Sequence, residues 1–226
     1  MAELNVFYRI CPNLSTKSPV FSDDKLALTM FSLRSFRKAF ENIDYKITFI
    51  LDSCPAIYRE KINKLITADK TFFTGVEMGN RGSLLKQIEL AALLENQDKV
   101  YLAEDDYIYL PGAGRKLVEA LDVFDSVTLY DHPDYYQEPH KSYGGEVKIY
   151  AQHHWVSRIS TCFSFGAKAE FIKENKRIIT KYAPIDYQMW CDITKKSQLY
   201  SPIPSLATHL VAWLLAPNIK WSLYGI

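Results

Sequence analysis

The stretch KVYLAEDDYIYLP, from Lys99 to Pro111, is the starting point for interpreting the whole sequence. An apolar run typical of a buried strand ends in three consecutive carboxylates, Glu104, Asp105 and Asp106, and the sequence then becomes apolar and aromatic again. Adjacent carboxylates repel one another, and each loses hydration beside an apolar core. Either water solvates the three acids or a cation binds next to them.

Strand-like and helix-like patterns alternate from the N-terminus to His132. The patterns predict strands over 4–10, 45–53, 70–76, 99–105 and 125–132, and helices over 23–43, 55–66, 82–96 and 111–124. This alternation predicts a mostly parallel sheet with helices on both faces. It fails from Pro133 onward, where a turn-rich aromatic segment precedes strands and a helix in 153–172, a helix over 184–196 and a proline-punctuated segment over 199–217.

Three loops follow strands of this predicted sheet: Cys11-Pro12, Asp52-Ser53 and the acidic triplet. In open sheets of this kind, ligands bind in the crevice beyond the carboxyl ends of the strands. Mg²⁺ and Mn²⁺ prefer oxygen ligands, and Mg²⁺ is often held by one or two carboxylates together with phosphate oxygens. We therefore expect the triplet to face a crevice that holds a metal–diphosphate complex.

Other residues invite both a functional and a structural interpretation. Gly79–Gly82 precede a predicted helix, so Arg81 and the free N–H groups could bind a phosphate, although neither the GxGxxG nor the P-loop pattern is present. The alternative is a glycine turn in which Arg81 and Lys86 are solvated. Asp52 could accept hydrogen bonds from a base or ribose, or it could cap the next helix.

Two residues of the C-terminal half raise the same question. His209 follows a rigid Pro-x-Pro stretch, from which it could reach back to the crevice, but a lone histidine is more often structural. Asp186 stands where a helix would begin, as an N-cap or a general base. The sequence alone does not choose between these roles.

Composition excludes several classes of protein. The 226 residues carry a net charge of +1, which argues against a global affinity for nucleic acid or acidic membranes but leaves room for a local patch. The 4 cysteines are widely spaced and form no CxxC pair, so we expect neither a zinc site nor a disulfide scaffold. We find no signal peptide and no spanning segment, and expect a cytoplasmic protein, with peripheral attachment to a membrane left open.

Taken together, several motifs resemble those of the GT-A glycosyltransferases, which use nucleotide-sugar donors. They are Asp52-Ser53, Gly79-Asn80-Arg81-Gly82, YLAEDDYIYLP, ISTCFSFGAKAEF, IDYQMW and PSLATHL. The resemblance implies an α/β/α sandwich of the Rossmann-like GT-A type, with a mostly parallel central sheet and a smaller C-terminal lobe on the acceptor side. It implies one domain over 1–226, in which 1–110 bind the nucleotide sugar and 111–226 bind the acceptor.

The resemblance also assigns roles to residues. Asp106 and His209 would bind Mn²⁺ or Mg²⁺, Asp105 would contact the ribose, and Glu104 would act through water or a basic neighbour. Asp186 would be the catalytic base of an inverting enzyme. The remaining assignments are Cys11, Pro12, Asp52, Arg81 and Lys86 in the donor site, with Asp52 contacting the base, and Tyr135, Tyr136 and Trp155 in the acceptor site.

The function implied is metal-dependent, inverting transfer of a sugar from a UDP-, GDP- or dTDP-linked donor to a hydroxyl of a carbohydrate or glycolipid. A nucleotidyltransferase that makes a nucleotide sugar is a rival function, but the loop CPNLSTKSP after the first strand lacks the glycines usual there. A non-catalytic carbohydrate-binding module and a metal-dependent hydrolase are two more rivals. The acidic triplet argues against the binding module, and the shortage of further His and Asp ligands argues against the hydrolase.

Overall fold

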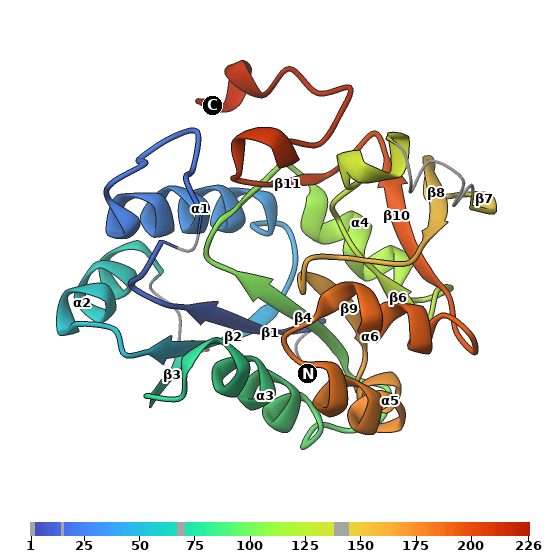
Figure 1. The fold of residues 1–226 in the computed structure, drawn as a ribbon, viewed down its shortest axis with the longest axis horizontal. Coiled ribbons are helices and arrows are strands. Elements are labelled where there is room, and N and C mark those ends of the chain that lie inside the picture. Colours follow the sequence, from blue (N-terminus) through green and yellow to red (C-terminus); the bar gives the residue numbers. More distant parts are fainter. Residues whose placement is uncertain (1–2, 15, 67–70, 138–144) are drawn as a thin grey trace.

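A nine-stranded sheet forms the centre of the molecule, in the order β3-β2-β1-β4-β9-β6-β10-β8-β7 (Figure 1). The computed structural model describes residues 3–14, 16–66, 71–137 and 145–226. The strands of this sheet are β1 (Leu4–Ile10), β2 (Tyr45–Asp52), β3 (Thr71–Val76), β4 (Lys99–Glu104), β6 (Ser126–Val127), β7 (Val147–Tyr150), β8 (His153–Arg158), β9 (Phe165–Lys168) and β10 (Leu199–Ile203). The expected mixed α/β fold with a large, mostly parallel central sheet is confirmed.

The parallel part of the sheet is the part that the sequence predicts best. β1 pairs in parallel with β2 and with β4, and β2 pairs in parallel with β3. The register places Ile10 opposite Leu51 and Arg9 opposite Glu104, so β1, β2 and β4 end at the same edge of the sheet. Their carboxyl ends therefore bring the three predicted loops together.

Beyond β4 the sheet becomes mixed. β9 is antiparallel to both β4 and β6, and β8 is antiparallel to both β10 and β7. The strand expected over 125–132 is reduced to β6, which has only 2 residues. A strand this short has too few residues to show a period of two, so the sequence pattern could not define its ends.

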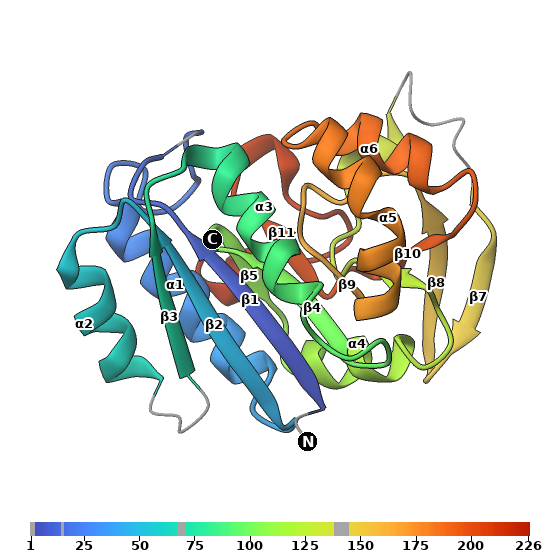
Figure 2. The same cartoon turned by 90° about the horizontal axis from the view of Figure 1, so that it is seen from below.

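Two apolar cores cover the two faces of the sheet, because alternate side chains of a strand point to opposite faces. Helices α1 (Lys25–Ala39), α2 (Ala56–Leu65) and α4 (Ala113–Ala120) pack on one face. Helices α3 (Gly79–Ala91), α5 (Ala169–Tyr182) and α6 (Asp186–Ile193) pack on the other, which Figure 2 shows in front of the strands. Among the helices that the structure describes, each is too short or too polar to cross a bilayer.

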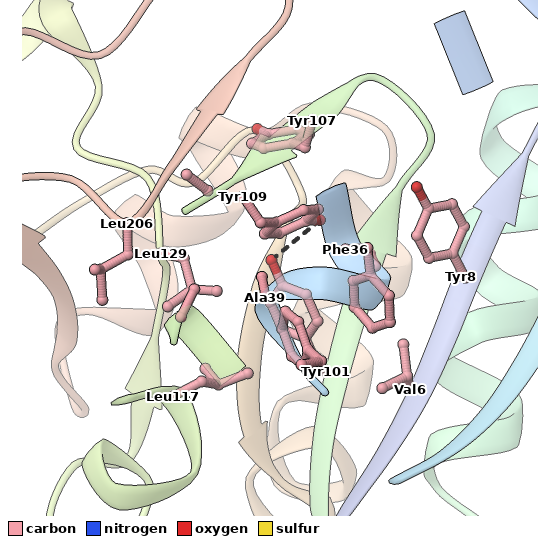
Figure 3. Packing of buried hydrophobic residues seen from close by; sticks show 14 of the residues in the cluster. Val6, Tyr8, Phe36, Ala39, Tyr101, Tyr107, Tyr109, Leu117, Leu129 and Leu206 are labelled. Carbon is pink, nitrogen blue, oxygen red and sulfur yellow. Dashed lines mark hydrogen bonds between the residues drawn. The ribbon is translucent and has the colours of Figure 1, made fainter. Parts of the chain in front are cut away.

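The core beneath α1 is unusually aromatic (Figure 3). Phe36 of α1 lies edge-on to both Tyr8 and Tyr109, with ring centroids 5.6 and 5.5 Å apart. The hydroxyl of Tyr101 lies 3.4 Å from that of Tyr109 and 2.8 Å from the hydroxyl of Ser164. Because these buried hydroxyls have partners, the tyrosines add rigidity to the strands that end at the sheet edge.

A small second sheet lies next to this edge. It pairs β5 (Tyr107–Tyr109), which follows β4 directly, with β11 (Ala207–His209) near the C-terminus. The register places His209 opposite Tyr107. This long-range antiparallel pairing, which no sequence pattern predicts, carries the C-terminal segment back over the end of β4.

Candidate active site

A cavity of about 320 Å³ opens at the carboxyl edge of the parallel strands, where β1, β2 and β4 end and α3 begins. All three acids of the triplet line it, together with Cys11 and Asp52. The structure therefore brings together the three loops that sequence reasoning placed at one crevice. Gly79, Asn80 and Ser83, from the N-terminal end of α3, also line it.

Each acid of the triplet contacts a different positively charged or basic side chain. Arg9 of β1 forms an ion pair with Glu104, with 2.9 Å between Nη2 and Oε2. The other two pairs are Lys25 with Asp105, at 2.7 Å, and His209 with Asp106, at 3.1 Å. The repulsion expected between the three neighbouring carboxylates is thus reduced by basic side chains from three separate elements.

Asp105 is fixed inside the protein. Lys25, the first residue of α1, donates to Oδ1, while Thr29 and the backbone N–H of Cys11 donate to Oδ2 at 3.3 and 3.2 Å. Burial works against the charge on Lys25, but the Asp105 carboxylate outweighs it and raises the pKa of that lysine above its ordinary value. The oxygens of Asp105 are therefore engaged in holding α1 and β1 together, and a contact with ribose would have to displace one of these donors.

Glu104 joins β4 to the start of α3 through Arg9. The guanidinium contacts both carboxylate oxygens, and its Nη1 donates to the backbone oxygen and to Oδ1 of Asn80, each at 2.6 Å. Burial raises the pKa of Glu104 to about 7, although the charge of Arg9 opposes this shift. The basic neighbour expected for Glu104 is thus Arg9.

Asp106 has a simpler environment. His209 Nε2 lies 3.1 Å from its Oδ2, and the imidazole stacks on the ring of Tyr107 with centroids 5.1 Å apart. Burial disfavours both charges, but the ion pair prevails, so the pKa of Asp106 is lowered and that of His209 is raised. The two residues predicted as metal ligands, 103 positions apart in the chain, are neighbours in the fold.

The donor set of Asp106 and His209 fits a divalent metal in two respects. Two ligands at right angles and about 2.1 Å from one ion lie about 3.0 Å apart, close to the observed separation of Oδ2 and Nε2. The side chains are 21% and 16% exposed, so a ligand can reach them. No group of three or more metal-ligating side chains occurs among the described residues. An ion here would therefore need further oxygens from a ligand or water.

Asp52 does not cap the next helix, α2, as one interpretation expected, but binds the entry to α3. Its Oδ1 accepts hydrogen bonds from the backbone N–H groups of Met78 and Gly79, at 3.1 and 3.3 Å, and so fixes the entry to α3. The third donor, the Ser53 hydroxyl, also reaches Oδ1, so within the described chain Oδ2 is the oxygen left for a ligand. The adjacent Ser53 has a φ of 57°, a left-handed conformation that is rare for serine and common at functional sites.

Asp186 accepts more hydrogen bonds than any acid of the triplet. Its two oxygens accept five hydrogen bonds, from the backbone N–H groups of Thr161, Cys162 and Phe163 and from the hydroxyls of Ser160 and Thr161. Cys162 and Phe163 have left-handed φ values of 52° and 62°, which turn their N–H groups towards the carboxylate. This geometry speaks against the base role and makes Asp186 the residue that shapes the loop before β9.

Several other predicted donor-site residues do not line the cavity. α3 begins at Gly79 and not after Gly82, which turns Arg81 away from the cavity, to the carbonyls of Ala183 and Thr180 at 2.9 and 2.8 Å. Lys86 forms an ion pair with Glu89 on the outer surface of α3. Pro12 is half-buried in the loop after β1 and is not part of the cavity lining.

The predicted acceptor residues separate into two groups. Trp155 is 0% exposed and its indole N–H donates to the carbonyl of Tyr150, so it packs in the core and offers no surface to a sugar. Tyr135 lines a second cavity of about 180 Å³ together with His132, Ser160 and Tyr187. Tyr136 lies beside it and is 44% exposed. Of the aromatic segment expected to bind an acceptor, residues 138–143 lie outside the described residues.

Ring contacts connect the two cavities. His209 stacks on Tyr107, Tyr107 lies edge-on to Tyr130 at 5.7 Å, and Tyr130 contacts His132 at 5.2 Å. Three successive ring contacts therefore connect His209, the partner of Asp106, to the second cavity.

Arg9 and Lys25 are the site residues that sequence reasoning missed. Arg9 is a single charge inside an otherwise apolar strand, LNVFYRI, and a buried charge requires a partner. Lys25 occupies the first position of α1, where the helix dipole disfavours a cation. Both are local conflicts with the predicted element, and each could have indicated an ion pair with the triplet.

No protein-family model matches the chain, and no curated protein sequence does. Solved structures do. The galactosyltransferase LgtC, in complex with donor and acceptor sugar analogues, has a TM-score of 0.54 at 10% identity, over 87% of this chain and 72% of that one. A putative nucleotide-diphospho-sugar transferase from Desulfovibrio desulfuricans G20 gives 0.55 at 15% identity, over 89% and 80%. The inositol-1-phosphate CTP transferase from T. maritima gives 0.54 at 12%, over 99% and 94%.

These likenesses define the fold. The chain has a GT-A-like glycosyltransferase fold, as the sequence motifs implied. At these low identities the comparison extends to the arrangement of helices and strands and not to the chemistry, which depends on the residues of the two cavities.

Proposed function

We propose that the protein transfers a sugar from a nucleoside-diphosphate sugar to an acceptor hydroxyl, with a divalent metal at Asp106 and His209. The observation that carries this proposal is the carboxylate–imidazole pair, 3.1 Å apart, beside the cavity at the carboxyl edge of the parallel strands. In this proposal residues 1–110 form the donor half and residues 111–226 the acceptor half.

The charges of the cavity support a donor that binds together with a divalent metal. Four acids line it, Asp52 and the triplet, against two cations, Arg9 and Lys25. A diphosphate carries further negative charge, so it would be repelled unless a cation entered with it. Bound Mn²⁺ or Mg²⁺ would neutralise the negative charge that grows on the departing diphosphate.

The residues of this chain would hold the two substrates. Asp52 Oδ2 would accept a hydrogen bond from the base or ribose, while Arg9 and the first turn of α3 would contact the donor. The acceptor would occupy the second cavity, which Tyr135, Tyr187 and Ser160 line. Because Asp186 is saturated with hydrogen bonds, the proposal does not retain it as base, nor the inverting mechanism that depended on it.

The test has two steps. Calorimetric titration of UDP, GDP and dTDP, with and without Mn²⁺, should show binding of at least one nucleotide only in the presence of the metal. A hydrolysis screen of the corresponding nucleotide sugars should then release the sugar slowly without an acceptor. Binding that is indifferent to metal would overturn the metal role, and a lack of any nucleotide binding would favour a carbohydrate-binding module.

A matched pair of histidine variants sharpens the result. His209→Asn should weaken metal-dependent nucleotide binding about 10- to 100-fold, as loss of a metal-site group does. His154→Asn changes an exposed histidine elsewhere on the sheet and should leave binding unchanged. Equal effects of the two substitutions would show that His209 has no special role.

A nucleotidyltransferase is the second candidate, because the T. maritima CTP transferase matches nearly the full length of both chains. Against it, the described residues 11–14 and 16–24 that follow β1 contain no glycine. Incubation with a nucleoside triphosphate and a sugar phosphate decides the point. Release of pyrophosphate would support this candidate and contradict the proposed sugar transfer.

A further inference from the structure

A third cavity lies outside the proposed active site, in the groove between α1 and α2, which lie side by side in Figure 1. It measures about 420 Å³, and its apolar lining comes from Leu26, Met30 and Leu65. Arg34, Lys61 and Lys64 line it as well. The α1 residues recur at helical spacing, so they share one face of that helix.

The groove is strongly cationic for a protein of net charge +1. Arg34, Lys61 and Lys64 are exposed, and none of the three forms an ion pair or a side-chain hydrogen bond within the described parts of the chain. The one acid in the lining, Asp24, accepts a hydrogen bond from the backbone of Ala27 as the N-cap of α1. Three cations against one acid, over an apolar floor, fit an anionic, amphiphilic occupant.

Exposed apolar side chains continue this surface on the other flank of α1. Phe21 is 44% exposed and packs on Phe31, at 5.6 Å between ring centroids. Gly225 lies against the same Phe31 ring, which brings the C-terminal 3₁₀ helix Trp221–Tyr224 beside α1. In that turn Leu223 is 73% exposed. From Leu210 to Ile226 the only charged side chain is Lys220, so no acidic side chain there opposes an anionic partner.

We propose that this surface, formed by the α1–α2 groove, Phe21 and the Trp221–Tyr224 turn, docks the protein on an anionic lipid bilayer. Lipid phosphates would contact Arg34, Lys61 and Lys64, while Phe21 and Leu223 insert between headgroups. Isolated aromatic and leucine side chains next to lysine and arginine are typical of surfaces that lie in a membrane interface.

The start of α1 connects the docking surface to the proposed donor cavity. Asp24 lines the groove and the next residue, Lys25, reaches into the proposed donor cavity. The groove and the proposed donor cavity therefore adjoin at the start of α1. Docking itself does not depend on catalysis, so its test is independent of the proposed function.

Vesicle co-sedimentation tests the proposal with the full chain. The protein should bind phosphatidylcholine vesicles that contain phosphatidylglycerol and should not bind vesicles of phosphatidylcholine alone. The triple variant Arg34→Gln, Lys61→Gln, Lys64→Gln should lose about 100-fold in affinity, since each basic side chain near such a surface is worth about fivefold. Leu223→Ser should weaken binding in the same vesicles without changing its dependence on salt.

The matched control removes the same charge from the opposite layer. Lys176→Gln, Arg177→Gln, Lys196→Gln, on and next to α5 and α6, should bind vesicles like the wild type, and thermal unfolding should show that both triple variants are folded. Equal loss in the two triples, or equal binding to both kinds of vesicle, would overturn the proposal. So would binding to soluble polyglutamate as tight as to vesicles and indifferent to Leu223→Ser, which would indicate an acidic protein partner.

Discussion

Two carboxylates of this molecule, Asp106 and Asp186, are both candidate functional groups in the sequence and have opposite environments in the fold. Among the described residues, Asp106 has one side-chain hydrogen-bond partner, the imidazole of His209, and it lines a cavity. Asp186 accepts five hydrogen bonds, three of them from consecutive backbone N–H groups. The difference teaches that a carboxylate next to a cavity is available for chemistry only in so far as the protein has left its lone pairs unused.

Asp105 provides an intermediate case and the largest expected effect. Lys25→Met would leave the Asp105 carboxylate, 8% exposed, buried without its cation. We expect a loss of about 3–5 kcal/mol in the free energy of unfolding, measured by urea denaturation. The double variant Lys25→Met, Asp105→Asn should recover part of this loss. A loss below about 1 kcal/mol would mean that the pair behaves as a surface ion pair and that Asp105 is open to a ligand.

Asp106→Asn should have the next largest effect, on binding and not on folding. Replacing the carboxylate should weaken Mn²⁺-dependent nucleotide binding about 100-fold, because an amide is a poor partner for a divalent cation. Calorimetric titration measures this. Asp125→Asn changes an exposed aspartate after α4 and should have no effect. If Asp106→Asn binds as tightly as the wild type, the contrast with Asp186 does not separate a functional acid from a structural one.

Asp186→Asn should have the opposite effect, on folding and not on binding. The amide NH₂ group cannot accept hydrogen bonds, so two or three donors of the loop before β9 lose their partner. We expect about 2 kcal/mol of lost stability with nucleotide binding retained. Thermal unfolding and the same titration measure the two quantities. Unchanged stability with abolished turnover would instead restore Asp186 as the catalytic base.

Lys86→Gln should have the smallest effect of all. Its ion pair with Glu89 lies on the outer face of α3, and both side chains are partly solvated, at 24% and 57% exposed. Such pairs contribute little, so stability should change by less than about 0.5 kcal/mol. Nucleotide affinity should not change. A clear loss of affinity would return this lysine to the donor site and show that α3 moves on binding.

The sequence predicts those parts of the fold in which the local pattern and the tertiary environment agree. β1, β2 and β4 are buried parallel strands with nearly continuous apolar runs, and their ends locate the cavity. The start of α3 was placed wrongly because its first N–H groups are bound from outside by Asp52, at 3.1 and 3.3 Å, in a contact that no local pattern encodes. β5 and β11 have only 3 residues each, too few to show a period.

The sequence predicts some residues of the site, namely the triplet, Asp52 and His209, and misses Arg9 and Lys25. The sequence places the triplet and Asp52 near one another because strand order and carboxyl ends follow from the alternation of elements, whereas it places His209 there only through the resemblance. The pairing of Asp106 with His209 follows the resemblance, whereas those of Asp105 with Lys25 and of Glu104 with Arg9 depend on side-chain directions set by packing. Asp105 and Asp106 both line the cavity, and the fold distinguishes them by their partners, because Asp105 accepts from Lys25, Thr29 and Cys11 while Asp106 contacts His209.

The separation of 103 residues between Asp106 and His209 has a consequence for the order of biosynthesis. A chain growing on the ribosome exposes β1, β2, α3 and β4, and thus the walls of the cavity, long before the imidazole emerges. Until β11 pairs with β5, Asp106 lacks the partner that balances its charge. The half-made protein therefore lacks one of the two proposed metal ligands, and the site is completed only once β11 has been made.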